Sequence, residues 1–108
     1  MHTVVETYEF ISQAKKLLTE EEKTAVINEL GKNPFIGDII KGTGGFRKIR
    51  VARKGSGKSG GYRVVYFFAT EEIPVILISV YAKNKQENLT DKQHNKLYEI
   101  AQTIKKGM

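Results

Sequence analysis

The chain contains no cysteine among its 108 residues. It therefore forms no disulfide, offers no thiolate nucleophile, and has no sulfur ligand for zinc. Histidine is almost as rare: only His2 and His94 occur, and neither lies near a candidate nucleophile or a carboxylate cluster in the sequence. We expect both histidines at the solvated surface and predict no metal site. These absences disfavour thiol, histidine and metal chemistry alike.

Long apolar runs are also missing. The longest, residues 73–80, is far too short to span a bilayer. The first ten residues, MHTVVETYEF, have neither a basic region nor a long apolar run, so we expect no signal peptide. Together with the lack of cysteine, this is compatible with a reducing cytoplasm, which is the location we predict. The length predicts a single domain, residues 1–108, with one modest core.

Acidic residues are absent from one segment, residues 41–63, which holds eight lysines and arginines. The formal net charge of the whole chain is +6, so the remainder sums to −2. A concentration of positive charge usually faces a polyanion, most often the phosphates of RNA or DNA.

Within this segment Gly57-Lys58-Ser59 resembles part of a nucleotide-binding P-loop. Ala52 stands where that motif needs glycine, however, and the segment leads into a strand rather than a helix. A basic loop between two strands is the better interpretation.

Three helices are predicted. Apolar residues repeat with helical spacing over residues 10–18. Thr19-x-x-Glu22 and Thr90-x-x-Gln93 are capping boxes that begin two further helices. The first of these should end at Gly31, because Asn33-Pro34 forbids its continuation. The apolar face of the last helix would consist of Leu97, Ile100, Ala101 and Ile104.

The remaining segments read as strands. Residues 74–81 form an almost unbroken apolar run, which is typical of a central strand buried on both faces. The other strands are predicted over residues 2–7, 47–53 and 62–69. The resulting order, β-α-α-β-β-β-α, indicates a small α+β fold. Its sheet would be mostly antiparallel, with two N-terminal helices packed on it and a C-terminal helix.

Alternation in the second strand places Lys48 and Arg50 on one side, and Ile49 and Val51 on the other. For a lone pair of cations, a solvated sheet face is the commoner explanation. Here the same region is crowded with further basic residues, and the next strand ends with a tyrosine and a lysine on a shared face. These additional residues are Arg47, Arg53, Lys54, Lys58, Arg63, Tyr81 and Lys83.

Clustered cations bind phosphates, and they lower the pKa of a lysine among them because like charge disfavours the protonated form. Such a lysine can take a proton from a ribose 2′-OH while arginine stabilises the pentacoordinate phosphate. Tyrosines in this region, Tyr62, Tyr66 and Tyr81, are more often core or half-buried sheet residues than platforms for a base.

The segment from Asn33 to Thr90 carries a resemblance to a known family. It contains NPFIGDIIKGTGGFRKIRVARKGSGKSGGYRVVYFF and, later, ISVYAKNKQENLT. These stretches resemble the RelE/ParE superfamily of type II toxins, and most closely its HigB-like branch, which shares similar G-x-G-G-[LF]-R-K-x-R, G-x-R-x-x-Y and Y-[AG]-K-N motifs. The resemblance covers nearly the whole chain in order. It implies a small cytoplasmic bacterial toxin that enters the ribosomal A site and cuts mRNA without a cofactor. It also implies an antitoxin partner, usually encoded beside the toxin.

Carried over by position, the resemblance implies that Lys48 is the candidate base and that Arg50 supports it. Arg63 matches the arginine that contacts the scissile phosphate, and Lys83 falls where relatives carry a cation near the leaving group. The residues left for RNA or ribosome binding are Arg47, Arg53, Lys54, Lys58 and Tyr81. RelE itself has a base-stacking tyrosine near its C-terminus, and the stretch near Leu89 here has none. Either Tyr81 takes that place or stacking is absent, and the general acid stays open.

Two alternatives remain. ParE-like relatives share the fold but poison gyrase, an activity that does not require four separate basic positions together. A non-catalytic RNA- or DNA-binding module would explain the charge but not the resemblance. Cleavage of translated mRNA distinguishes the toxin ribonuclease from both.

Overall fold

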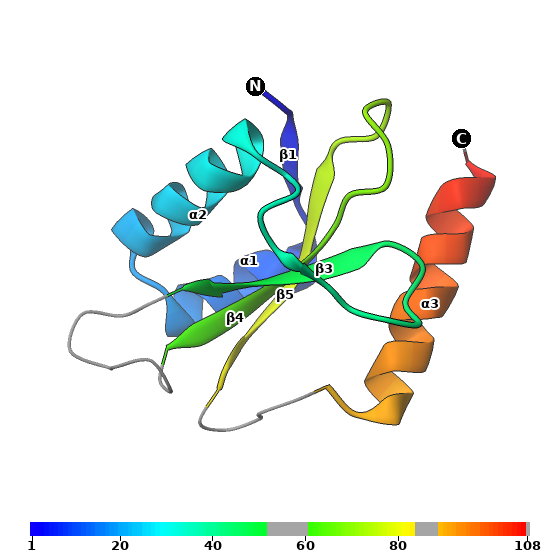
Figure 1. Cartoon of the computed structure of the whole chain (residues 1–108). Helices are drawn as coiled ribbons and strands as arrows, with labels where there is room; N and C mark the ends of the chain where they lie inside the picture. Colours follow the sequence, from blue (N-terminus) through cyan, green and yellow to red (C-terminus); the bar gives the residue numbers. More distant parts are fainter. Residues whose placement is uncertain (52–60, 84–88, 108) are drawn as a thin grey trace.

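The computed structural model describes residues 1–51, 61–83 and 89–107, which form an α+β fold of a mixed sheet and helices on both of its faces (Figure 1). The elements in chain order are β1 (Val4–Glu6), α1 (Tyr8–Leu17), α2 (Glu20–Lys32), β2 (Asp38–Ile39), β3 (Phe46–Val51), β4 (Tyr62–Phe67), β5 (Val75–Ala82) and α3 (Asp91–Lys106).

Within the described residues the sheet has five strands in the order β1-β5-β4-β3-β2. Strand β5 lies between β1 and β4, which confirms the prediction of a central strand. Only β1 is parallel to its neighbour, and the other pairings are antiparallel. Strand β2 was not predicted: it has two residues, too few for a periodicity, and forms because Asp38 and Ile39 pair with β3. Among the described residues no helix is long and apolar enough to cross a membrane.

Both predicted capping boxes are confirmed. The Thr19 hydroxyl accepts the Glu22 amide at 3.1 Å, and the Glu22 carboxylate accepts the Thr19 amide at 2.8 Å. Thr90 and Gln93 repeat this geometry at the start of α3.

The predicted end of α2 at Gly31 is wrong, because the helix continues to Lys32. Gly31 allows a close approach instead: its carbonyl accepts the His2 amide at 2.7 Å, and a Cβ there would lie 3.3 Å from the Met1 side chain. The glycine therefore brings the N-terminus against the last turn of α2 without breaking the helix.

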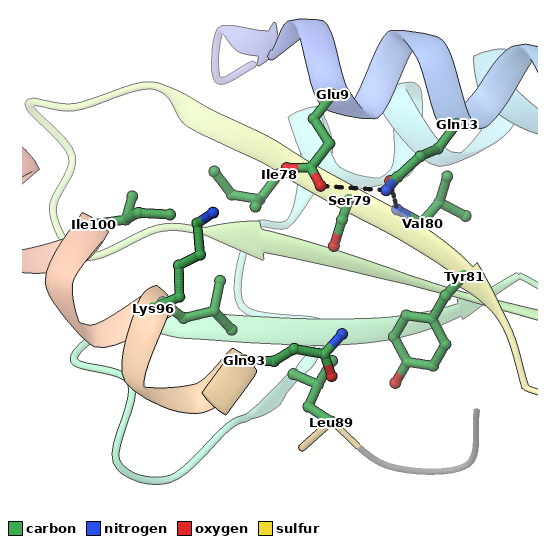
Figure 2. Close-up of a pocket in the computed structure, with 11 residues that line it drawn as sticks. Glu9, Gln13, Ile78, Ser79, Val80, Tyr81, Leu89, Gln93, Lys96 and Ile100 are labelled. Carbon is green, nitrogen blue, oxygen red and sulfur yellow. Dashed lines mark hydrogen bonds between the residues drawn. The ribbon is translucent and has the colours of Figure 1, made fainter. Parts of the chain in front are cut away.

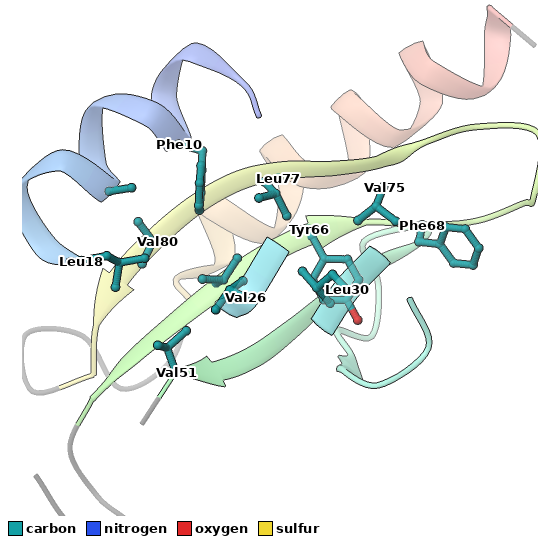
Figure 3. Close-up of a cluster of buried hydrophobic side chains, with 12 residues drawn as sticks. Phe10, Leu18, Val26, Leu30, Val51, Tyr66, Phe68, Val75, Leu77 and Val80 are labelled. Carbon is teal, nitrogen blue, oxygen red and sulfur yellow. The ribbon is translucent and has the colours of Figure 1, made fainter. Parts of the chain in front are cut away.

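The buried side chains of the described residues form two clusters rather than the single core expected from length, because both faces of the sheet are covered. Helices α1 and α2 cover one face, and the cluster beneath them includes Phe10, Leu30, Tyr66 and Leu77 (Figure 3). Helix α3 covers the other face. The cluster under α3 contains Ile40, Phe46, Val65, Phe67, Ile78, Leu97 and Ala101.

The turn from β2 to β3 determines where α3 docks. Gly45 has φ of +139°, and a Cβ there would lie 2.8 Å from the Phe67 ring. A Cβ at Gly44 would lie 3.2 Å from that of Ala101 on α3. Only glycine lets the turn pass this close to the helix. Helix α3 therefore packs over the Phe46 end of β3 and does not extend over the strand's whole length.

Candidate functional site

The basic residues of β3 and β4 lie opposite one another across the sheet. In the strand register Arg50 pairs with Arg63, and Arg63 pairs with Tyr81 on β5. Directly paired residues have Cα atoms about 4.5–5.5 Å apart, and their side chains share a face. Lys48 lies two residues before Arg50 and on the same face. We call Lys48, Arg50 and Arg63 the cationic row.

The cationic row is on the α3 side of the sheet, beyond the part that α3 covers. Phe46 and Phe67 on this face are fully buried under the helix, whereas the three basic residues further along are only half-buried. Asp38 pairs with Lys48 across β2 and β3, but the two form no ion pair among the described residues. Two arginines in direct cross-strand register repel each other. A phosphate bound between them would relieve that repulsion.

Strand β5 brings Lys83 and Tyr81 to the same end of the sheet. The Lys83 amide donates to the Gly61 carbonyl at 3.2 Å, which ties the end of β5 to the start of β4, two residues before Arg63. Tyr81 is half-buried against the cluster under α3. Its hydroxyl is buried and has no hydrogen-bond partner among the residues that the structure describes. Burial raises the pKa of Tyr81, and the charge of Arg63 opposes this shift. Tyr81 therefore presents a protonated hydroxyl at neutral pH.

Arg47 is not part of this arrangement. It pairs with Tyr66 and so lies on the opposite face of the sheet, the face that α1 and α2 partly cover. Its guanidinium donates to the carbonyls of Gly37 at 2.9 Å and Phe35 at 3.3 Å, and lies 5.4 Å from the centre of the Phe35 ring. The alternation of β3 puts Arg47 on the same side as Ile49, a signal in the sequence that could have separated it from the cationic row. Arg53, Lys54 and Lys58 lie outside the described residues.

Neither histidine is fully solvated, contrary to the prediction. His2 is half-buried, with Nε2 2.6 Å from a Glu71 carboxylate oxygen and its ring edge-to-face with Phe68. His94, in the first turn of α3, is half-buried as well. No group of three or more histidines and carboxylates that could hold a metal gathers within the described part of the chain.

A pocket of about 170 Å³ lies beside the cationic row, between α1, β5 and α3 (Figure 2). Tyr81 forms part of its wall and thereby joins the two features. Apart from Tyr81, the polar lining residues are Glu9, Gln13, Ser79, Gln93 and Lys96. Sequence reasoning identified Gln93 only as part of a capping box and did not connect any of them with a pocket. They come from α1, β5 and α3 and share no motif, so only the tertiary structure brings them together.

Comparison with known families decides the identity of the chain. The sequence model of the RelE toxin of the RelE/RelB toxin–antitoxin system matches residues 3–107, nearly the whole chain. The chain belongs to the RelE toxin family. This RelE-family protein is therefore a type II toxin, and membership implies a RelB-like antitoxin as its partner.

The fold of this RelE-family toxin is also that of a solved relative. It is similar to E. coli toxin RelE, in a mutant with two arginines replaced by alanine and in the free state, with a TM-score of 0.61 and 24% sequence identity. The similarity covers 80% of this chain and 87% of that one. The expected RelE-like α+β fold is thus confirmed.

Proposed function

We propose that this RelE-family toxin is a ribosome-dependent mRNA endonuclease of the HigB-like branch. The observation that supports this proposal best is the cationic row, in which Lys48, Arg50 and Arg63 share one sheet face beyond the cover of α3. Clustered cations of this kind bind a phosphodiester and stabilise the extra negative charge of its transition state. The proposed substrate is mRNA in the ribosomal A site, and the proposed place of action is the cytoplasm.

The proposed reaction uses the ribose 2′-OH as nucleophile. Lys48, as the proposed base, takes the 2′-OH proton while the 2′-oxygen attacks the adjacent phosphorus. Arg63, supported by Arg50 across the strands, binds the non-bridging oxygens of the pentacoordinate phosphate. The bond from phosphorus to the 5′-oxygen then breaks, giving a 2′,3′-cyclic phosphate and a 5′-OH. This sequence of steps needs no metal ion.

Lys83 and Tyr81 are assigned to the leaving-group end of this site. Lys83 is tied to the start of β4 through Gly61 and brings an ammonium group that balances charge on the departing 5′-oxygen. The proton for that oxygen comes from one of the two groups at this end that carry one, the Lys83 ammonium or the Tyr81 hydroxyl. Tyr81 carries a hydroxyl that stays protonated at neutral pH, so it is a hydrogen-bond donor beside Arg63.

Primer extension on translated mRNA tests the proposal. Induction of the toxin should halt growth and produce new 5′ ends within reading frames, and purified toxin should produce them only when ribosomes are present. Matched reactions with Arg63→Ala should show no new ends. Gyrase-linked DNA breaks with intact transcripts would instead establish a ParE-like activity and exclude the endonuclease.

A further inference from the structure

The pocket between α1, β5 and α3 is partly open and large enough to admit a flat aromatic group. A cavity of about 150 Å³ in another protein accommodates benzene, and this pocket measures about 170 Å³. It opens next to Tyr81, whose strand partner is Arg63. A nucleotide whose phosphate lies on Arg63 thus has a base-sized pocket one residue pair away.

Opposite charges face each other across this pocket. Figure 2 shows Glu9 reaching from α1 and Lys96 from α3 toward the same stretch of β5. Both side chains belong to exposed residues, and within the described part of the chain neither takes part in an ion pair. Glu9 accepts one long hydrogen bond, 3.4 Å, from Gln13. A carboxylate acceptor and an ammonium donor are therefore both available to an occupant.

The remaining lining suits a flat ring rather than an added peptide strand. Ile78 and Leu97 form apolar walls, and the buried Tyr81 hydroxyl has no hydrogen-bond partner within residues 1–51, 61–83 and 89–107. Strand β1 pairs with β5 only over Val75–Leu77, so the rest of that edge of β5 has no neighbouring strand. A peptide that extended the sheet would have to pair there. That edge is already closed, because the Gln13 amide oxygen accepts the Val80 backbone N–H at 2.8 Å. An occupant must therefore bind side chains rather than extend the sheet.

We propose that this pocket binds a guanine of the RNA, next to the phosphate held by the cationic row. Guanine carries adjacent N1–H and N2–H donors, which fit the Glu9 carboxylate, and O6 and N7 acceptors, which fit the Lys96 ammonium. Other RNA bases lack the pair of adjacent donors. The inference rests on the proposed function, since it names the base that accompanies the scissile phosphate. It makes Glu9 and Lys96 specificity-determining residues.

Nucleotide binding tests the pocket without cleavage. In ¹H–¹⁵N NMR titrations of the full-length chain, guanosine monophosphate should shift the amide signals of residues 78–81. Inosine monophosphate, which lacks the 2-amino group, should bind about tenfold more weakly, as should guanosine monophosphate to Glu9→Gln, because each loses a hydrogen bond to a charged group. The matched variant Glu99→Gln, on an exposed part of α3 outside the pocket, should bind like wild type. Equal shifts with every nucleotide, or none at residues 78–81, would overturn the guanine assignment.

Mapping of cleavage sites separates this inference from the proposed function. Wild-type sites should share a guanine at one fixed position, and Glu9→Gln and Lys96→Ala should relax that preference while Lys92→Ala, outside the pocket, retains it. Guanine-selective binding without any RNA cleavage would support the pocket and refute the nuclease. Cleavage whose base preference is unchanged in Glu9→Gln and Lys96→Ala would support the nuclease and refute the pocket.

Discussion

Replacement of Arg63 by alanine should separate catalysis from stability. The only hydrogen bond found for its guanidinium within the described residues is a local one of 3.3 Å to the Tyr62 carbonyl. Arg50 faces Arg63 across the strands, so the substitution also removes a like-charge repulsion. We expect the free energy of unfolding to change by less than about 1 kcal/mol, as for most substitutions outside a core. The rate of RNA cleavage should fall about 10²–10³-fold, the usual loss when one transition-state donor is removed.

The assay compares two measurements on the same preparations. Urea unfolding gives the stability, and single-turnover cleavage on programmed ribosomes, followed by primer extension, gives the rate. Lys48→Ala and Lys83→Ala, measured alongside, should impair cleavage less completely. A folded Arg63→Ala protein that cleaves at the wild-type rate would refute the role given to Arg63. If all three variants were also as toxic as wild type, the whole site assignment would be wrong.

Arg47→Ala is the matched arginine control for this experiment. Because Arg47 lies on the opposite face and donates to the Gly37 carbonyl at 2.9 Å, its loss should lower stability by about 1.5–3 kcal/mol, the range for a hydrogen bond to a charged group. Cleavage per folded molecule should stay near the wild-type rate. A large rate loss with unchanged stability would show that Arg47 contacts RNA or the ribosome after all.

The remaining predictions concern the core and the antitoxin. Tyr66→Phe should lower the free energy of unfolding by about 2–5 kcal/mol in urea. The buried Tyr66 hydroxyl accepts the Gly37 amide at 2.9 Å and donates to the Pro34 carbonyl at 2.8 Å, and both groups would be left unpaired. A loss below about 1 kcal/mol would mean that water replaces the hydroxyl. Association with an acidic antitoxin should slow markedly as salt rises in stopped-flow mixing, since charge complementarity steers the encounter; a salt-independent rate would count against a charged docking surface. Hydrogen exchange on the complex should distinguish two modes of neutralisation. Protection of β3 and β4 would indicate that the antitoxin covers the site directly. Protection confined to α1, α2 and α3 would indicate that it blocks ribosome entry sterically. A chain that binds no protein encoded beside it would contradict the toxin assignment as a whole.

Local features of the sequence determined the helices and most strands. Thr19 and Thr90 begin their helices through hydrogen bonds to residues three positions away, so the capping motifs contain all the information they need. The apolar run of residues 74–81 predicted a central strand buried on both faces, and β5 contributes side chains to the buried clusters on both faces of the sheet. Alternation in β3 also placed Lys48 and Arg50 on a common face, because side chains of a strand alternate whatever its neighbours are.

Features that depend on contacts between distant segments came only from the tertiary structure. Strand β2 exists because β3 pairs with it, and the two buried clusters exist because helices from both ends of the chain cover opposite faces of the sheet. The pairing of Arg50 with Arg63 and of Arg63 with Tyr81 depends on strand register, which residue types alone do not specify. Glu9 and Lys96 line the same pocket only because α1 and α3 pack beside the same strand. Local hydrogen bonds and periodicity depend on residues close together in the sequence, whereas strand register and packing depend on contacts between distant parts of the chain.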